Sequence, residues 1–397
     1  MNIAIMGAGE IAAKMALTLQ PLKEANCYAI AARDQERAQA FADKYGFRRA
    51  YGSYLDMLAD EYVNLVYIAT PHSHHYEHIK MCLEHGKHVL VEKPFTANAA
   101  QAEEVMEMAR ERGLLVTEAM WTRYMPMVQT VREVVASSMI GRISSLSACI
   151  GYPLENRERL RRPELAGGAL LDVGIYALHF ASIVFGDRLK SISASCTKLE
   201  TGVDAQETIM LTYEDGRMAN LFATMLAQTD NKAVIYGSNG YIEVDNITNF
   251  EMIRVYNLEK KVIAEYAAPY QVTGYEYEVE SAMNAIRYRQ PECPEMPHEV
   301  TLHTIRMMDN LRKAWDIVYP FELDPEASPT EIGEEADEEI RMRRESSVRE
   351  ISNTAGKDTQ EKDIEEKEVS EDASEDAAAE SAPEEVTEEV TEETTEA

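Results

Sequence analysis

The first twelve residues constrain the fold more than any other stretch of the chain. Residues 3–6 form a short apolar run that is typical of a buried parallel strand. The run enters Gly7-Ala8-Gly9-Glu10-Ile11-Ala12, a G-x-G-x-x-A turn, and an apolar helix pattern follows. In dinucleotide folds such glycines allow a tight turn and close approach of the backbone to a pyrophosphate. The order predicts a phosphate-binding turn with Gly7, Gly9, Glu10 and Ile11 at the cofactor; an ordinary strand-to-helix turn is the alternative.

Residues 1–118 continue this alternation of strand and helix patterns. Predicted strands cover residues 28–32, 65–69, 88–91 and 114–117, and predicted helices cover residues 35–45, 76–85 and 97–112. Such alternation predicts an α/β domain with a doubly wound parallel sheet, that is, a Rossmann domain over residues 1–118.

After residue 118 the pattern changes to short strands separated by turn signals such as Asp215-Gly216 and Asn239-Gly240. Predicted strands cover residues 208–213, 218–224, 233–236, 241–244, 253–256 and 262–266, and predicted helices cover residues 126–138, 168–185, 275–289 and 299–315. We therefore expect an α+β domain over residues 119–322 with a large open, mainly antiparallel sheet built from consecutive hairpins.

The charge of the chain is concentrated at its C-terminal end. Residues 323–397 carry 28 acidic and 7 basic side chains and lack aromatic residues. Such a composition buries too little apolar surface to offset the entropy of ordering, so we expect a disordered acidic tail. The rest of the chain is mildly acidic, which excludes a basic nucleic-acid surface.

Cysteine and apolar content point to a cytoplasmic protein. The five cysteines are scattered without C-x-x-C spacing, as expected in a reducing compartment. A strand at residue 3 leaves no room for a signal peptide, and no run is expected to reach the ~18 apolar residues of a membrane span.

The end of the second predicted strand bears on cofactor choice. An acidic residue there binds the ribose 2′-hydroxyl of NAD, whereas arginine accommodates the 2′-phosphate of NADP. Arg33 occupies this position and Arg37 follows one helical turn later, while Asp34 stands one position late and should point elsewhere. This pattern favours NADP over NAD.

Two further segments carry residue types suited to proton transfer. Lys93 lies in Glu92-Lys93-Pro94 at the C-terminal end of a strand, the edge where ligands bind in such sheets, and the Lys93–Pro94 bond is a candidate cis peptide. Asp172 and Tyr176 stand four apart on a predicted helix and share one face. An aspartate among apolar neighbours needs a buried partner, which a lysine from the other domain would supply. A helix cap with Tyr176 as core filler is the structural alternative.

Together these segments resemble the glucose–fructose oxidoreductase/inositol dehydrogenase/rhizopine catabolism (Gfo/Idh/MocA) family. The similarity is closest to its dimeric dihydrodiol dehydrogenase branch, which includes NADP-dependent xylose dehydrogenases, and it covers residues 1–322. It rests on the glycine turn and on Ala32-Arg33-Asp34, Thr70-Pro71-His72, Glu92-Lys93-Pro94, Trp121-Thr122-Arg123 and residues 168–176.

The resemblance implies an NADP-dependent enzyme, with NAD possible, that moves a hydride to or from a carbon bearing a hydroxyl or carbonyl group of a small sugar, polyol or vicinal diol. Lys93, Tyr176 and Asp172 match catalytic positions, and Lys93 is expected to lower the Tyr176 pKa. Trp121 matches a wall of the pocket, and His72 departs from the asparagine common in the family. Further cofactor contacts are implied for Thr70, Pro71, His72, His75, Glu92, Lys93, Trp121 and Arg123.

Several alternatives remain open from sequence. The same fold also serves as a non-catalytic NADP- or sugar-binding regulator, although a sensor has no use for a proton relay. His74 and His78 stand at i, i+4, but no Glu or Cys completes a metal site, so no metal is expected. The arginine-rich residues 151–166, with Arg157 and Arg159, are expected to cap the pocket or bind an anionic group. The resemblance suggests a homodimer through the open sheet.

Overall fold

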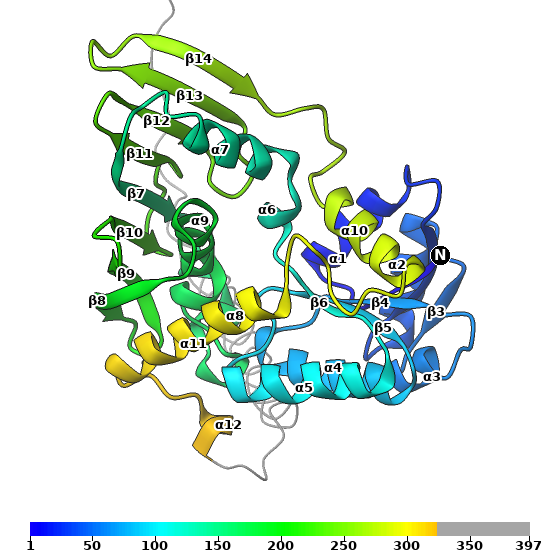
Figure 1. The fold of residues 1–397 in the computed structure, drawn as a ribbon. Helices are drawn as coiled ribbons and strands as arrows, with labels where there is room; N and C mark the ends of the chain where they lie inside the picture. The colour runs from blue at the N-terminus through cyan, green and yellow to red at the C-terminus, as the bar shows by residue number, and fades with distance from the viewer. Residues whose placement is uncertain (324–397) are drawn as a thin grey trace, which may run out of the picture. The chain divides into compact units, whose positions relative to one another are not determined.

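The computed structural model describes residues 1–323, which contain two β-sheets and the helices that cover them (Figure 1). Apart from its first residue, the predicted acidic tail at 323–397 lies outside the described residues.

The first sheet has six parallel strands in the order β3-β2-β1-β4-β5-β6. Chain order reverses between β1 and β4, which makes the crevice at their carboxyl ends the expected ligand site. This arrangement confirms the predicted doubly wound sheet. Its strands are β1 (Asn2–Met6), β2 (Asn26–Ala31), β3 (Arg49–Tyr51), β4 (Leu65–Ile68), β5 (His88–Glu92) and β6 (Val116–Ala119), and its helices are α1 (Glu10–Leu19), α2 (Gln35–Tyr45), α3 (Tyr54–Leu58), η1 (His72–His74), α4 (His75–Glu84) and α5 (Ala99–Arg112).

The second sheet has eight strands in the order β14-β13-β12-β11-β7-β10-β9-β8 and is mainly antiparallel, as predicted. It is not built from consecutive hairpins alone, because β7 lies between β10 and β11 and runs parallel to β10. Its strands are β7 (Ile143–Gly151), β8 (Leu189–Lys198), β9 (Asp204–Tyr213), β10 (Met218–Thr224), β11 (Ala233–Gly237), β12 (Gly240–Asp245), β13 (Met252–Asn257) and β14 (Val262–Ala267).

Helices cover one face of the second sheet and bridge to the first (Figure 1). The central helix α9 packs on β7 and β10, whereas α10 lies beside β5 and α11 beside α5. The late helices therefore tie the two sheets together. The helices of this part are α6 (Trp121–Tyr124), α7 (Pro126–Ala136), α8 (Glu158–Arg161), η2 (Pro163–Leu165), the π-helix η3 (Leu170–Gly174), α9 (Ile175–Phe185), α10 (Glu276–Arg287), α11 (His298–Ala314) and α12 (Pro320–Leu323).

One helical stretch among residues 1–323, Pro163–Phe185, is long and apolar enough to cross a membrane by length and composition. The prediction that no stretch reaches that length is therefore wrong for this one. Most of it is buried, since 89% of its apolar window lies inside the structure. Contact with the second sheet accounts for its composition, because a core helix buried all round is apolar on every face.

Candidate active site

The glycine turn forms an open cradle at the start of α1. Gly7 has a φ of +99°, and a Cβ there would lie 2.9 Å from the Ala69 carbonyl oxygen, so only glycine fits. At Gly9, in contrast, a Cβ would meet no atom within 4 Å. Gly9 is the N-cap of α1 and provides no side chain to the free amides there. Free amides facing open space fit an anionic pyrophosphate.

Two arginines lie at the edge beyond β2. Arg33 and Arg37 are both exposed there, and Arg37 Nη2 donates to the Ala8 carbonyl oxygen at 2.9 Å. The Asp34 carboxylate accepts from the Arg37 amide at 2.7 Å and so caps α2. Asp34 therefore points elsewhere, as predicted, because its carboxylate faces the start of α2.

Lys93 lies at the carboxyl end of β5 and reaches across to the second part of the chain. The Lys93–Pro94 peptide bond is cis, as the sequence suggested. Lys93 Nζ donates to the Asp172 carbonyl oxygen at 2.6 Å and to Asp172 Oδ1 at 3.0 Å. The buried aspartate thus has the predicted lysine partner.

Asp172 belongs to the π-helix η3 rather than to the regular helix predicted over residues 168–185. Besides Lys93, its Oδ1 lies 3.1 Å from Arg159 Nη2 and 3.6 Å from His72 Nε2. Burial alone would raise the pKa of Asp172, but the charges of Lys93 and Arg159 hold it well below its usual value. Asp172 is therefore an anion that two cations share.

Tyr176, one helical turn beyond Asp172, also lies beside Lys93. Lys93 Nζ is 5.2 Å from the centroid of the Tyr176 ring. Trp121 Nε1 donates to the Tyr176 hydroxyl at 3.1 Å. Burial, with smaller contributions from Tyr275 and Glu92, raises the pKa of Tyr176 well above 10. The expectation that the pKa of Tyr176 is lowered is therefore wrong, because burial raises it despite the neighbouring Lys93.

Trp121 forms a wall beside Tyr176. Its ring stacks on Tyr275 with centroids 4.5 Å apart and an interplanar angle of 5°. A Cβ at Gly274 would lie 2.7 Å from Trp121 Cζ3, so the glycine allows the stack to form. The position of Trp121 beside Tyr176 is where the predicted pocket wall would lie, and that role stays a prediction.

The loop after β4 brings Thr70, Pro71 and two histidines to the same edge. His72 Nδ1 donates to the Ala166 carbonyl oxygen at 3.1 Å, and burial lowers the pKa of His72, so the ring is neutral at pH 7. The nitrogens of His75 face the carbonyl oxygens of Pro94 at 2.7 Å and Thr70 at 3.0 Å. His75 therefore links this loop to the Lys93 loop and offers no ring nitrogen to a cofactor.

Two other predicted cofactor residues are directed elsewhere. Arg123 Nη1 donates to His179 Nδ1 and to Ser182 Oγ, both at 3.3 Å, inside the second part of the chain. The buried Glu92 carboxylate accepts from the Tyr67 hydroxyl, and burial raises its pKa. Direct cofactor contacts by the Arg123 and Glu92 side chains are not supported by this geometry.

The arginine-rich segment is placed across the site, which sequence alone did not establish. Arg157 Nη1 lies 2.7 Å from Glu10 Oε1 at the glycine turn, and Arg159 contacts Asp172. These contacts place residues 157–159 beside both the glycine turn and Asp172, and the capping role stays a prediction. The arginine content of this segment was the only sequence signal for its position near the site.

Two buried acids on β9 support η3 and were missed from sequence. Asp204 Oδ2 accepts from the Leu170 amide at the start of η3. A Cβ at Gly174 would lie 2.3 Å from Glu207 Oε1, so the Glu207 carboxyl rests directly on the π-turn. Alternating acids in a strand give a signal only once that face is known to be buried.

The histidine pair binds neighbours within its own loop. His74 Nδ1 lies 2.9 Å from Ser73 Oγ, and His78 Nδ1 lies 2.9 Å from Thr70 Oγ1. Among residues 1–323, no group of three or more His, Cys, Asp or Glu side chains is arranged to hold a metal ion.

Comparison with protein families matches most of the described chain. Residues 1–120 match the model described as "Oxidoreductase family, NAD-binding Rossmann fold", and residues 128–243 match "GFO/IDH/MocA C-terminal domain". Trans-1,2-dihydrobenzene-1,2-diol dehydrogenase of Xenopus tropicalis is 33% identical over 324 residues, covering 80% of this chain and 98% of the relative. The human enzyme of the same name is 33% identical and is covered to 97%.

Solved structures give the same fold. A 3-ketoreductase from Actinomadura kijaniata, in complex with NADP and TDP-benzene, has a TM-score of 0.73 at 26% identity, covering 79% of this chain and 97% of that one. Aldose-aldose oxidoreductase from Caulobacter crescentus has a TM-score of 0.72 at 19% identity, covering 80% and 97%, and shows likeness of fold alone.

Proposed function

Because this chain belongs to the Gfo/Idh/MocA family of oxidoreductases, we propose that it is an NADP-dependent dehydrogenase or reductase acting on the CH–OH or carbonyl group of a small sugar, polyol or vicinal diol. The observation that carries the proposal is the buried contact of Lys93 with Asp172 beside the Tyr176 ring, whose hydroxyl accepts from Trp121. Relatives named for a dihydrodiol support the substrate class, and a 3-ketoreductase bound to NADP supports the cofactor class.

The glycine turn and the arginines beyond β2 offer groups that suit two parts of a dinucleotide. The amides at the start of α1 would bind the pyrophosphate, and Arg33 and Arg37 the 2′-phosphate. When bound, the nicotinamide supplies the acceptor or donor of a hydride.

The chain's own residues would then handle the proton. The Trp121 N–H donates to the Tyr176 oxygen, so the Tyr176 O–H remains able to donate to a substrate oxygen. Lys93 stabilises negative charge on that oxygen, and Asp172 holds Lys93 through both a backbone and a side-chain oxygen. Tyr176 would therefore give its proton in carbonyl reduction and take it back in alcohol oxidation.

The high pKa of Tyr176 makes the two directions differ in pH dependence. The protonated phenol persists from about pH 6 to about pH 9, so kcat/KM for carbonyl reduction is expected to be flat over that range. Alcohol oxidation needs the phenolate and should rise up to about tenfold per pH unit. Initial rates in both directions test this. A reduction rate that falls with a midpoint near pH 7 would place the titrating group elsewhere.

The arginines beyond β2 give a test of cofactor choice. Arg33→Ala removes a cation from the expected 2′-phosphate site, so KM for NADP should rise about 10- to 100-fold, with KM for NAD within about threefold. Arg112→Ala, exposed at the end of α5, is the matched control and should leave both values unchanged. Equal effects on both cofactors would contradict the assignment.

We also propose a cytoplasmic homodimer formed through the outer face of the second sheet. That face exposes Met210, Met218 and Tyr236, and Tyr241 stacks on Tyr256 at 4.6 Å beside them. Large apolar groups on an uncovered sheet suit a partner surface. Sedimentation equilibrium of the full chain tests the dimer, and a monomer at micromolar concentration would contradict it.

A panel of aldoses and vicinal diols with NADP or NAD, and of dicarbonyls with NADPH or NADH, followed at 340 nm, tests the proposed activity. Turnover of at least one class with NADP is expected. Tight NADP binding without turnover of any class would instead favour the non-catalytic regulator.

A further inference from the structure

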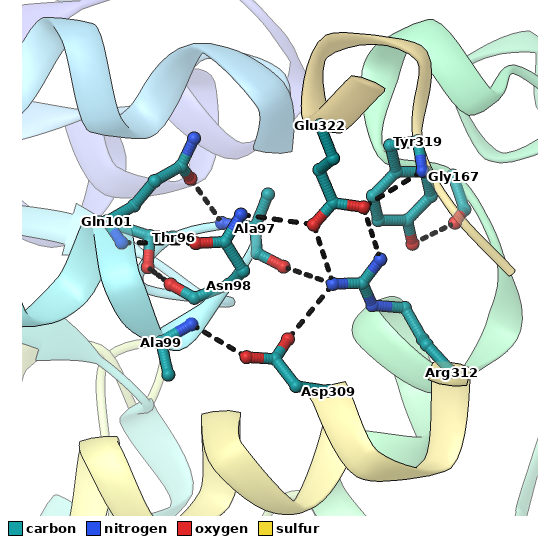
Figure 2. A network of polar contacts seen from close by, with 10 residues as sticks. All are labelled: Thr96, Ala97, Asn98, Ala99, Gln101, Gly167, Asp309, Arg312, Tyr319 and Glu322. Carbon is teal, nitrogen blue, oxygen red and sulfur yellow. Dashed lines mark hydrogen bonds and ion pairs between the residues drawn. The ribbon is translucent and has the colours of Figure 1, made fainter. Parts of the chain in front are cut away.

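A buried arginine on α11 lies at the junction of the two parts of the chain. Arg312 is only 4% exposed, and Figure 2 shows its guanidinium group at the centre of a polar network. Arg312 Nη1 donates to Glu322 Oε2 at 2.8 Å, and Nη2 donates to Glu322 Oε1 and Asp309 Oδ1, both at 2.9 Å. A guanidinium group suits this role because its donors form a rigid fork.

The network holds the segment that follows Lys93. Arg312 Nη2 donates to the Ala97 carbonyl oxygen at 3.3 Å. Asn98 Nδ2 donates to Glu322 Oε1 at 3.0 Å, and the Ala99 amide donates to Asp309 Oδ2 at 2.8 Å. Arg312 and its two carboxylate partners, Asp309 and Glu322, therefore fix the start of α5, a few residues after Lys93.

Tyr319 connects the same guanidinium group to the segment that precedes Asp172. Arg312 Cζ lies 4.5 Å from the centroid of the Tyr319 ring. The Tyr319 hydroxyl donates to the Gly167 carbonyl oxygen at 2.9 Å, and its amide donates to Glu322 Oε2 at 2.9 Å. Gly167 is itself tightly packed, since a Cβ there would lie 2.5 Å from the Leu160 carbonyl oxygen.

We propose that Arg312, Tyr319 and Glu322 form a positioning clasp for catalysis. The clasp fixes the segment after Lys93 and the segment before Asp172 relative to one another, and so sets the contact between Lys93 Nζ and Asp172. Its catalytic consequence rests on the proposed function, whereas its structural consequence does not.

Two substitutions in the full chain test the clasp. Tyr319→Phe removes only the bond to Gly167 and keeps the ring beneath Arg312, and Arg312→Lys keeps the charge but loses the fork. Displacement of catalytic groups by about 1 Å can cost about 100-fold, so kcat should fall about 10-fold for Tyr319→Phe and about 100-fold for Arg312→Lys. The dissociation constant for NADPH, from fluorescence titration, should stay within about twofold, because the cradle is not touched.

The matched control is Arg306→Lys. Arg306 lies on the same helix and bonds Glu103 of α5 at 2.6 Å, but both side chains are at least half exposed. Its substitution should leave kcat unchanged. D-xylose and trans-cyclohexane-1,2-diol serve as substrate probes.

Amide hydrogen exchange followed by mass spectrometry separates failure of the clasp from failure of the proposed function. Both clasp variants should exchange faster in residues 94–101 and in residues 167–174, and Arg306→Lys should not. Unchanged exchange in either segment for Tyr319→Phe would overturn the clasp, even if the chain turned over neither substrate. Faster exchange with a lower melting temperature but wild-type kcat would reduce the network to a purely structural role and would also overturn the proposal.

Discussion

Replacement of Lys93 by methionine is expected to lower kcat about 10³- to 10⁴-fold, the upper part of the range for a group that assists proton transfer. Methionine retains the apolar stem but removes the Nζ that contacts the Asp172 carbonyl and carboxylate oxygens. In the proposed mechanism, charge that develops on the substrate oxygen would then lose the cation that stabilises it. The glycine cradle is untouched, so NADPH affinity should stay within about threefold.

Combining Tyr176→Phe with Lys93→Met tests whether the loss of activity in Lys93→Met reflects proton transfer through Tyr176. The two residues act as one unit, so the double variant should be hardly slower than Lys93→Met alone. Lys80→Met is the control, because Lys80 bonds Glu104 at the surface and lies outside the site. Steady-state rates of Lys93→Met, Tyr176→Phe, the double variant and Lys80→Met test this expectation. Turnover by Lys93→Met within about tenfold of wild type would contradict a role in proton transfer.

Substitution of Asp172 by asparagine should lower the free energy of unfolding more than any other substitution in the site. The variant keeps the shape of the side chain but leaves Lys93, whose side chain is 12% exposed, without its anion. Removal of one partner from a buried ion pair costs about 3–5 kcal/mol, and the partly exposed Arg159 adds little. Urea unfolding of the two proteins measures the difference.

The difference in stability between wild type and Asp172→Asn should also depend on pH. Because the pKa of Asp172 is lowered in the folded chain, its stabilisation is present above the ordinary value of 3.8 and disappears as the pH falls through the folded pKa. The gap between wild type and variant should therefore be constant from about pH 5 to about pH 8 and shrink in acid. Asp215→Asn is the control, because that surface pair with Arg217 should contribute no measurable stability. A gap that persists unchanged in acid would contradict this account of Asp172.

Local sequence signals were sufficient for the first sheet and for the central pair of the site. Gly7 specifies a turn that few other residues could form, and strand and helix periods alternate regularly after it. Asp172 could be paired with Lys93 because a carboxylate among apolar residues requires a cation. The free-energy cost of burying an unpaired carboxylate, rather than a sequence pattern alone, predicted that contact.

Non-local features could not be predicted in the same way. Insertion of β7 between β10 and β11 depends on pairing between segments far apart in sequence, which no hairpin signal reports. The π-turn at Leu170–Gly174 depends on Asp204 and Glu207, which approach it from another strand. Arg123 was assigned to the cofactor from its motif, but its buried partners His179 and Ser182 belong to a helix whose orientation the sequence does not give.

Transfer of deuterium tests the central claim most directly. The full chain would be incubated with NADP and D-xylose deuterated at C1, or with trans-cyclohexane-1,2-diol deuterated at its carbinol carbons, and the reduced cofactor examined by NMR. The account predicts deuterium at C4 of the nicotinamide from at least one probe, in wild type and not in Lys93→Met with Tyr176→Phe. Reduction of NADP without deuterium at C4, or equal transfer by the double variant, would contradict it.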